Sequence, residues 1–303
     1  MNTPLTTLKT LSVRVRDKHA AILSRMVFEA NQVWNAANAE TAVGCYIPVP
    51  EVGWIPFKSG AAQWKNGQVR FAGYHFKVWD SHGLSQYAFR AGSFSEDARG
   101  RWYFNVVVEV AVEKASGTAH IGIDLGLKET ATCSNGDKLE RSDFYRKLEA
   151  KLGIAQRANQ KKRVKAIHAK IKNRRKDALH KFTTQLVREN ELIVVGDVSS
   201  SALTKTKMAK SVLDAGWFML KTQLKYKAMA RSVVFLEVNE AYSTQACSDC
   251  GSISINSPKG RTGLGIREWL CPDCRTLHDR DVNAARNHLA AGYSRLAGGI
   301  PVL

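Results

Sequence analysis

Hydrophobic and polar residues alternate strictly near the start of the chain. Within residues 7–16, Leu11, Val13 and Val15 fall on one face, while polar and basic side chains fall on the other. This period of two is typical of a half-buried β-strand. From Asp17, the expected N-cap, apolar residues instead recur at steps of three and four, which predicts an amphipathic helix.

Strands account for most of the next hundred residues. Gly and Pro are frequent in residues 44–60, so we expect the helix to end there. Strand-like runs follow at residues 68–71 and 74–79, and apolar residues alternate over residues 102–112. The first part of the chain is therefore predicted to be a small antiparallel β-barrel with one long helix inserted.

The second half follows a different pattern, in which short apolar runs alternate with helical segments. Strands are predicted at residues 119–126, 129–134, 192–197 and 233–239, with a hairpin turn at Asn135-Gly136 into a further strand. Helices are predicted within residues 141–190 and 208–231. This order is expected of an RNase H-like α/β domain, in which the fourth and fifth strands lie side by side and parallel.

Composition supports a folded chain and adds a class of partner. The 303 residues, 44% of them hydrophobic, suggest about two domains. Lys and Arg number 45 against 27 Asp and Glu, a formal net charge of +18. Such an excess usually reflects a polyanionic partner. No stretch approaches the ~20 apolar residues of a membrane-spanning helix, and the N-terminus does not resemble a secretory signal. We therefore expect a nucleic-acid partner, no membrane and a cytoplasmic location.

Much of the positive charge lies in one helical stretch. Residues 151–176 contain eleven Lys or Arg and no acidic residue, while Val164, Ile167 and Ile171 form a thin apolar stripe. Charge runs are usually solvated helix faces, but here no acidic partner is available for intrahelical ion pairs. We predict a helix that contacts nucleic-acid phosphates. The residues concerned are Lys161, Lys162, Arg163, Lys165, Lys170, Lys172, Arg174 and Arg175.

Four of the six cysteines form two Cys-x-x-Cys pairs separated by 20 residues, whereas Cys45 and Cys133 stand alone. The paired residues are Cys247, Cys250, Cys271 and Cys274. Two pairs at this spacing can place four thiolates around one Zn²⁺ at ~2.3 Å. In a chain without a secretory signal, we interpret them as a metal site in a reducing cytosol. Because thiolates fill all four positions, the predicted zinc is structural.

Acidic residues appear where strands and helices meet. Asp124 ends the first strand of the second half, in the run Ile-Gly-Ile-Asp-Leu-Gly. A carboxylate there is costly to desolvate unless it binds a cation. Directly after the second cysteine pair, residues 278–287 (HDRDVNAARN) open a helix. An Asp in this run can also serve simply as a helix N-cap.

Together these motifs resemble the TnpB family of RNA-guided nucleases, which bacterial insertion sequences encode and which are ancestral to type V CRISPR effectors. The resemblance rests on GIDLG, LIVVGDVSS, KMAKSVLDAGW, STQACSDCG, DRDVNAARN, RGRWYFNVVVEV and the C-terminal GGIPVL. It covers nearly the whole chain. It implies a wedge-like β-barrel over residues 1–118, with a helical recognition lobe reduced to about residues 17–44. It also implies a split RuvC-like nuclease domain over residues 119–303, with a zinc finger at about 245–276.

The resemblance also assigns catalytic positions. Asp124 matches the first RuvC aspartate and Asp281 the last, but the position usually held by Glu falls on Gly196. Two-metal hydrolysis usually needs a third carboxylate. We expect Glu240 to supply it, because the ends of the fourth and fifth strands reach the same sheet edge. Asp197 is the alternative, although successive residues of a strand face opposite sides of a sheet.

The resemblance implies an RNA-guided DNA endonuclease that cleaves double-stranded DNA next to a short duplex motif. It implies two catalytic Mg²⁺, one structural Zn²⁺ and a guide RNA from the transposon end, in the bacterial cytoplasm at the nucleoid. Two alternatives remain open. Gly196 and the short lobe are compatible with a guided DNA binder without cleavage, acting as a repressor or transposition regulator. A sequence-specific DNA-binding protein that uses no RNA is the other.

Overall fold

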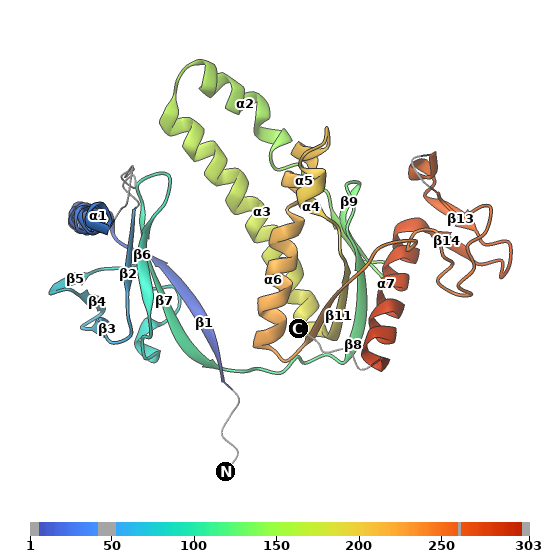
Figure 1. Cartoon of the computed structure of the whole chain (residues 1–303), viewed down its shortest axis with the longest axis horizontal. Coiled ribbons are helices and arrows are strands. Elements are labelled where there is room, and N and C mark those ends of the chain that lie inside the picture. Colours follow the sequence, from blue (N-terminus) through green and yellow to red (C-terminus); the bar gives the residue numbers. More distant parts are fainter. Residues whose placement is uncertain (1–5, 42–52, 260–261, 299–303) are drawn as a thin grey trace, which may run out of the picture. The chain divides into compact units, whose positions relative to one another are not determined.

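The computed structural model describes residues 6–41, 53–259 and 262–298 (Figure 1). The chain divides into two compact units, Met1–Val112 and Glu113–Leu303, whereas the sequence analysis set the boundary after residue 118. Cys45, residues 42–44 of the expected helical lobe and residues 299–303 of the C-terminal motif lie outside the described residues.

The first unit contains two antiparallel sheets that share one core. Strands β1 (Thr6–Arg14), β7 (Trp102–Ala111), β6 (Gly92–Glu96) and β2 (Trp54–Phe57) form a sheet in this order. Strands β3 (Ala62–Lys65), β4 (Gln68–Phe71) and β5 (Tyr74–Phe76) form the second. A backbone bridge between Val15 and Val78 joins them. The described strands therefore form two linked sheets, where the sequence analysis expected one barrel.

The alternation read from the sequence sets which side chains enter this core. Leu11, Val13 and Val15 are all buried, as predicted. From the partner strands, the rings of Phe94 and Phe104 pack 5.1 Å apart between their centroids. Burial of these apolar and aromatic side chains is the main stabilising contribution to the unit.

The helix of the first unit departs from its prediction at the N-terminal end and in how much of its apolar stripe is buried. A short 3-10 turn covers Asp17–His19, and helix α1 runs from Ala20 to Thr41. Asp17 is therefore not the N-cap; its carboxylate instead accepts hydrogen bonds of 2.7 and 2.8 Å from the Arg14 guanidinium. Leu23 and Val27 are buried, but Val33 is 71% exposed, so less of the apolar stripe is buried than its periodicity predicted.

The second unit is built on a mixed five-stranded sheet. Its order is β10 (Lys138–Glu140), β9 (Glu129–Cys133), β8 (Ala119–Asp124), β11 (Asn190–Gly196) and β12 (Val234–Val238). The strands β8, β11 and β12 are parallel, while β9 and β10 pair antiparallel as a hairpin. The fourth and fifth strands of this unit are thus parallel neighbours, as predicted.

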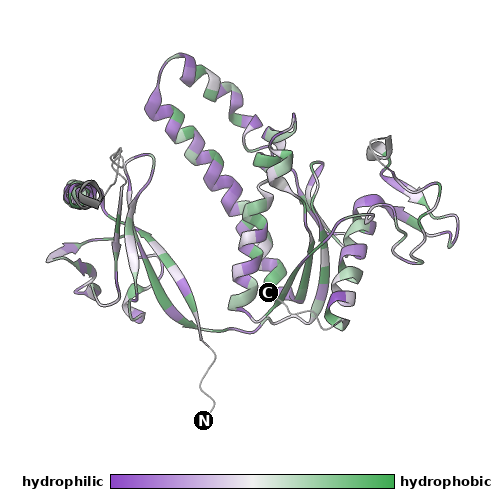
Figure 2. Ribbon diagram, viewed as in Figure 1, coloured by the Kyte–Doolittle hydropathy of each residue, from purple (hydrophilic) through white to green (hydrophobic). Residues whose placement is uncertain are grey.

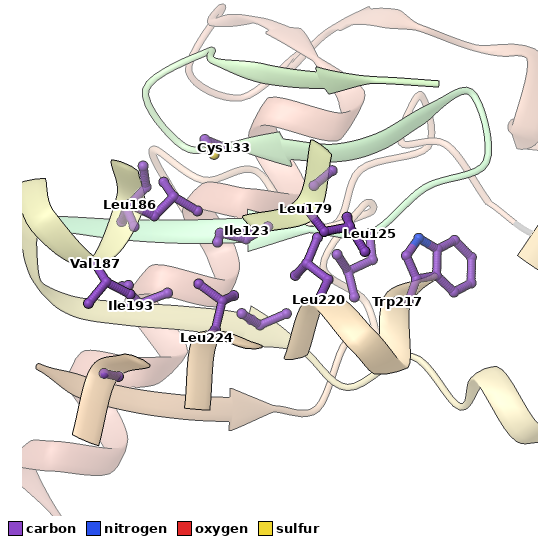
Figure 3. Packing of buried hydrophobic residues seen from close by; sticks show 14 of the residues in the cluster. Ile123, Leu125, Cys133, Leu179, Leu186, Val187, Ile193, Trp217, Leu220 and Leu224 are labelled. Atoms are coloured by element: carbon purple, nitrogen blue, oxygen red, sulfur yellow. The ribbon is translucent and has the colours of Figure 1, made fainter. Parts of the chain in front are cut away.

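Helices cover both faces of this sheet. They are α2 (Arg146–Arg157), α3 (Lys161–Glu189), α4 (Ser200–Leu203), α5 (Ala209–Ala215), α6 (Trp217–Ala230) and α7 (Arg280–Ala297). On β11, Ile193 and Val195 face a core with α3 and α6, in which Figure 3 shows Ile193. Leu192 and Val194 pack on the other side, where α7 lies. The helix predicted over residues 208–231 is broken at Gly216, whose φ of 71° ends α5 and begins α6.

Hydropathy follows this layering (Figure 2). The strands of the second unit are hydrophobic, whereas the α2–α3 hairpin carries many hydrophilic residues along its length. Within residues 6–41, 53–259 and 262–298, no helix combines the length and the apolar character needed to cross a membrane.

Helix α7 lies directly on the backbone of the sheet. A methyl group at Gly122 of β8 would overlap the carbonyl oxygen of Ala285 on α7, and one at Gly292 of α7 would overlap the Val194 side chain. Glycines at these positions permit an approach that a Cβ would prevent. This close packing fixes the helix relative to the carboxyl ends of β8 and β11.

We predict that Gly122→Ala lowers the free energy of unfolding by about 3 kcal/mol, because α7 must move to accommodate the methyl group. The matched control is Gly153→Ala in the interior of α2, where the new methyl would meet only the flexible end of Arg157. This control is expected to stabilise the chain by about 0.5–1 kcal/mol. Denaturant unfolding measures both changes, and equal effects at the two positions would contradict the packing argument.

Candidate catalytic and metal-binding site

The parallel strands β8, β11 and β12 end together at one edge of the five-stranded sheet of the second unit. The register pairs Ile123 of β8 with Val195 of β11, and Gly196 of β11 with Val238 of β12. One residue further along β8 lies Asp124, and two residues beyond Val238 lies Glu240. Polar groups after parallel strands commonly form sites at this edge. The structure therefore brings Asp124 and Glu240 to the same end of the sheet.

Helix α7 adds Asp281 to this edge. The N-cap is Asp279, whose carboxylate accepts hydrogen bonds from the backbone N–H groups of Asp281 and Val282 at 2.9 and 3.0 Å. The simple capping role is therefore filled by Asp279, which leaves Asp281 available. Its carboxylate accepts a hydrogen bond of 3.1 Å from the guanidinium of Arg267.

The negative charge of Asp124 acts on both of the other carboxyl groups. Glu240 is an exposed residue, but partial loss of hydration raises the pKa of its carboxyl group above the usual value, and the negative charges of Asp124 and Asp197 raise it further. Burial and the charge of Asp124 raise the pKa of Asp281 in the same way. A divalent cation would relieve both the repulsion and the loss of hydration. The oxygen donors match the preference of Mg²⁺. Among the described residues, however, these oxygens do not converge as closely as the cysteine sulfurs do.

Asp197, the alternative third carboxylate, has a different partner. Its carboxylate accepts a hydrogen bond of 2.9 Å from Nζ of Lys221 on α6. The same Nζ donates a second hydrogen bond, of 2.6 Å, to the carboxylate of Glu237. The helix α6 packs on the sheet face opposite α7. The Asp197 side chain is 61% exposed and already paired with a cation.

A residue that the sequence analysis missed lies at the centre of this site. His288 of α7 is 1% exposed, and its Nε2 lies 3.4 Å from Oδ1 of Asp124. A Cβ at Gly196 would lie 2.6 Å from the same nitrogen, so the ring occupies the space beside Gly196. The signal in the sequence was a histidine seven residues after Asp281, which places both on one helix face.

The four paired cysteines form a compact cluster. Their ligand atoms all lie within 4.8 Å of one another. The Sγ atoms of Cys247 and Cys274 are 3.5 Å apart, and those of Cys250 and Cys271 are 3.7 Å apart. Bonds of ~2.3 Å to one tetrahedral zinc ion give a spacing of about 3.8 Å between sulfurs. The cluster therefore fits a zinc ion, as the spacing of the cysteines predicted.

Two asparagines of α7 hold the chain that leads into this cluster. The Asn283 amide donates hydrogen bonds to the carbonyl oxygens of Ser243 and Ala246, and its Oδ1 accepts one from Ser248 N at 2.9 Å. Asn287, one turn later, donates to the same two carbonyl groups at 2.7 and 2.8 Å. This asparagine clamp ties the base of the cysteine cluster to the helix that carries Asp281 and His288.

The predicted phosphate-binding residues lie on α3, and all except Arg175 have exposed side chains. Arg175 is 17% exposed and donates a hydrogen bond of 2.8 Å to Oδ1 of Asp214. Asp214 also accepts a hydrogen bond from Tyr145 N at 3.1 Å. Arg175 therefore forms a partly buried ion pair that joins α3 to α5, and its inclusion among the phosphate contacts is corrected.

Comparison with known proteins identifies two family models along the chain. Residues 103–207 match the model described as "Probable transposase" (OrfB_IS605). Residues 217–288 match the "Cas12f1-like, TNB domain" model. The second match includes all four cysteines, Glu240 and Asp281.

Similar proteins carry names consistent with these models. A "Putative RNA-guided DNA endonuclease" of Streptomyces pristinaespiralis is 38% identical over 220 residues, covering 68% of this chain and 53% of that protein. The "Putative RNA-guided DNA endonuclease InsQ" of Escherichia coli (strain K12) is 30% identical over 230 residues, covering 66% of this chain and 56% of that protein. The chain thus matches about half the length of these relatives. The cryo-EM structure of a Cas12f1–sgRNA–target DNA complex matches with a TM-score of 0.44 and 13% identity, covering 93% of this chain and 99% of that one.

Proposed function

Because this chain belongs to the TnpB-like transposase family, we propose that it is an RNA-guided DNA endonuclease of a bacterial transposon. The sheet from β10 to β12 would be the core of a RuvC-like nuclease domain. The observation that carries this proposal is that β8, the end of β12 and the start of α7 bring Asp124, Glu240 and Asp281 to one sheet edge, where the charge of Asp124 raises the pKa of both other carboxyl groups. Clustered carboxylates whose charges repel one another are typical of cation sites that hydrolyse phosphodiesters.

Asp124, Glu240 and Asp281 would hold two Mg²⁺ ions. When bound, such ions activate water for in-line attack and stabilise the leaving oxygen of the phosphodiester. The residues of the chain supply position and charge. Asp124 is fixed by the backbone of β8, and Asp281 by the N-cap of α7. The Arg267 guanidinium balances the charge of Asp281 and would give way when a cation binds there.

Glu240 is the third carboxylate in this proposal. Gly196 has no side chain, and the neighbouring Asp197 is paired with Lys221. Glu240 follows the adjacent parallel strand, and its pKa is raised first by loss of hydration and then by the charge of Asp124. Its carboxylate would therefore replace the one that Gly196 cannot supply.

Other parts of the second unit would bind nucleic acid around this site. The exposed basic side chains of α3 would contact the phosphates of the guide RNA or of its duplex with target DNA, whose base pairing supplies sequence specificity. The cysteine cluster would hold one structural zinc ion near the catalytic edge. The first unit would act as a wedge-like domain with a reduced recognition lobe. The complex would act on double-stranded DNA in the bacterial cytoplasm, at the nucleoid.

A guided DNA binder without cleavage is the second candidate. The buried ring beside Gly196 favours it, because His288 occupies the space that a carboxylate side chain at this position would need. Such a protein would keep its RNA and DNA partners and act as a repressor or a regulator of transposition. Cleavage assays on the RNA-bound protein separate the two candidates.

We predict that Glu240→Ala lowers the Mg²⁺-dependent cleavage rate at least ~100-fold while RNA and DNA binding persist, because one cation loses a ligand. Asp124→Ala is expected to abolish cleavage. Asp197→Ala is the matched control and is expected to retain activity. Cleavage of labelled DNA by the RNA-bound protein measures all three. Normal cleavage by Glu240→Ala together with loss in Asp197→Ala would identify Asp197 as the third ligand. No cleavage by the unmodified protein with its own guide RNA would favour the binder.

The cysteine cluster is expected to bind about one equivalent of zinc per chain. Cys247→Ser should lose this zinc and lower the melting temperature, since the metal holds two loops together. Cys133→Ser is the matched control: Cys133 is a single buried cysteine whose pKa burial raises to about 12, so it should not bind metal as a thiolate. Metal analysis of the purified variants tests this. Zinc retained by Cys247→Ser, or lost from Cys133→Ser, would contradict the assignment.

For α3, we expect that replacing Lys161, Lys162 and Arg163 with Ala weakens RNA binding across sequences. The slope of log K against log[salt] should fall by ~0.7–0.9 for each phosphate contact removed. Lys181→Ala on the same helix is the control, because Lys181 is paired with Asp177 at 2.8 Å. Binding titrations at several salt concentrations measure the slope. An unchanged slope in the triple variant would show that this basic surface is only solvated.

A further inference from the structure

We propose that His278 donates a hydrogen bond to the Cys247 thiolate of the zinc-loaded cluster, and that this bond links zinc binding to the position of Asp281. The inference rests on the proposed function, because the zinc ion and the role of Asp281 belong to it. His278 would be a positioning residue between two sites that have so far been treated separately, and it would bind neither metal itself.

The ring of His278 lies directly against the cysteine cluster. Its Nε2 is 3.0 Å from Sγ of Cys247. Both residues are buried, with exposed fractions of 2% and 1%. On the neighbouring strand, Trp269 is the register partner of His278, and the centroids of the two rings are 4.8 Å apart. The ring therefore contacts both the tryptophan and the sulfur and has almost no surface left for solvent.

The metal determines which of the two groups donates. A cysteine binds zinc as a thiolate, which carries no hydrogen and can only accept. The imidazole of His278 must then carry its hydrogen on Nε2, which faces the sulfur. A hydrogen bond to an ionised acceptor is stronger than one between neutral groups. Without zinc the sulfur returns to a thiol, which is a weak acceptor. The hydrogen bond from His278 is thus strong only when the cluster holds its metal.

The buried position of Cys247 explains why its sulfur needs donors from the protein. Four thiolates carry more negative charge than one Zn²⁺ neutralises, so the loaded cluster is an anion. A buried charge is costly unless it is hydrogen-bonded. Cys250 and Cys274 are exposed, so water can hydrate their sulfurs, whereas Cys247 is buried. Backbone N–H groups of Asp249 and Cys250 act on the Cys247 sulfur, and the imidazole adds a side-chain donor.

Strand β14 (Leu277–Asp279) connects this hydrogen bond to α7. His278 is the middle residue of the strand, and the next residue, Asp279, is the N-cap of the helix. The carboxylate of Asp279 accepts the backbone N–H of Asp281 at 2.9 Å. A ring anchored on Cys247 therefore fixes the short stretch of backbone that leads to Asp281.

Strand β13 (Glu268–Leu270) reaches the same carboxylate by a second route. Cys271 directly follows this strand, and Arg267 directly precedes it. The carbonyl oxygen of Arg267 accepts a hydrogen bond of 2.7 Å from the backbone N–H of Arg280, and its guanidinium donates to the carboxylate of Asp281. Zinc binding at one end of the two-stranded ribbon would therefore set both the carboxylate and its positive partner at the other end.

The test uses the whole chain without RNA, loaded with Zn²⁺ or with Co²⁺. His278→Phe keeps an aromatic ring beside Trp269 but has no hydrogen to donate. His278→Gln is the matched control, because its side-chain amide carries N–H groups at a similar reach to Nε2. In competition with a chelator, His278→Phe should bind zinc about 10–100-fold more weakly than the unmodified protein, and His278→Gln within about threefold of it.

Cobalt spectra report the hydrogen bond itself. Loss of a donor raises the energy of the sulfur electrons, so the thiolate-to-cobalt charge-transfer band of His278→Phe should move to longer wavelength, while that of His278→Gln should not. Unchanged zinc affinity and an unchanged band in His278→Phe would overturn the inference. Equal losses in His278→Gln would do the same, since ring packing would then explain both. A spectrum of three thiolates and one nitrogen in the unmodified protein would make His278 a ligand and also overturn it.

Amide hydrogen exchange measures the link to Asp281. The N–H groups of Asp281 and Val282 are bonded to the carboxylate of Asp279. In zinc-loaded His278→Phe they should exchange about tenfold faster than in the unmodified protein, because the first turn of α7 opens more easily. Exchange in β8 should not change. If the first turn of α7 exchanges at the same rate in both proteins, His278 does not link zinc to Asp281.

Two further measurements separate the possible failures. Should His278→Phe fail to fold, nitrogen NMR of the unmodified zinc-loaded protein should show the ring hydrogen of His278 on Nε2; a ring with its hydrogen only on Nδ1 would overturn the inference. Zinc binding that persists in Cys247→Ser would overturn the zinc site of the proposed function, and this inference with it. The outcomes described for His278 overturn the inference alone and leave the proposed function in place.

Discussion

The direct contact between α7 and the backbone of the central strands determines the geometry of the whole candidate site. Gly122 and Gly292 allow helix and sheet to approach without intervening side chains. The helix therefore carries Asp281 and His288 to the strand ends that hold Asp124. A helix resting on ordinary side chains would lie farther from the sheet, and His288 would no longer cover Gly196. The charge cluster at the sheet edge thus depends on two residues that have no side chain.

The same helix also organises the cysteine cluster. Asn283 and Asn287 are one turn apart, and both hold the carbonyl groups of Ser243 and Ala246. The loop carrying Glu240 lies just before this clamp, and the backbone N–H of Ser243 donates to the carbonyl oxygen of Glu240. Helix α7 therefore uses two sides: one carries Asp281 and the buried His288 to the sheet edge, and another holds the chain between Glu240 and the cysteine cluster.

Local patterns predicted most of the fold and part of the site. The period of two placed β1 and β7, and apolar runs and turn residues placed the strands of the second unit along the chain; the parallel pairing of its fourth and fifth strands was expected from the RNase H-like order. The cysteine spacing predicted the cluster, because the two cysteines of each pair are close together in the sequence. The predictions failed where distant residues decide. Arg175 pairs with Asp214 from another helix, and His288 meets Asp124 across most of the second unit. Asp17 was mistaken for a cap because Arg14, its actual partner, belongs to the preceding strand.

The asparagine clamp has a consequence for how this region can diverge during evolution. The clamp is one anchor, because it fixes the chain at residues 243–248, which end just after the first cysteine of the first pair. The second anchor is β14 (Leu277–Asp279), which follows the second cysteine pair and leads directly into α7. The segment between the two anchors includes Gly251 and the strand β13 (Glu268–Leu270), and its turns lie outside both anchors. Insertions and deletions in the outer loop would leave both anchors in place. The loop between the cysteine pairs is therefore the part of the second unit where length can change most freely without moving the sheet edge.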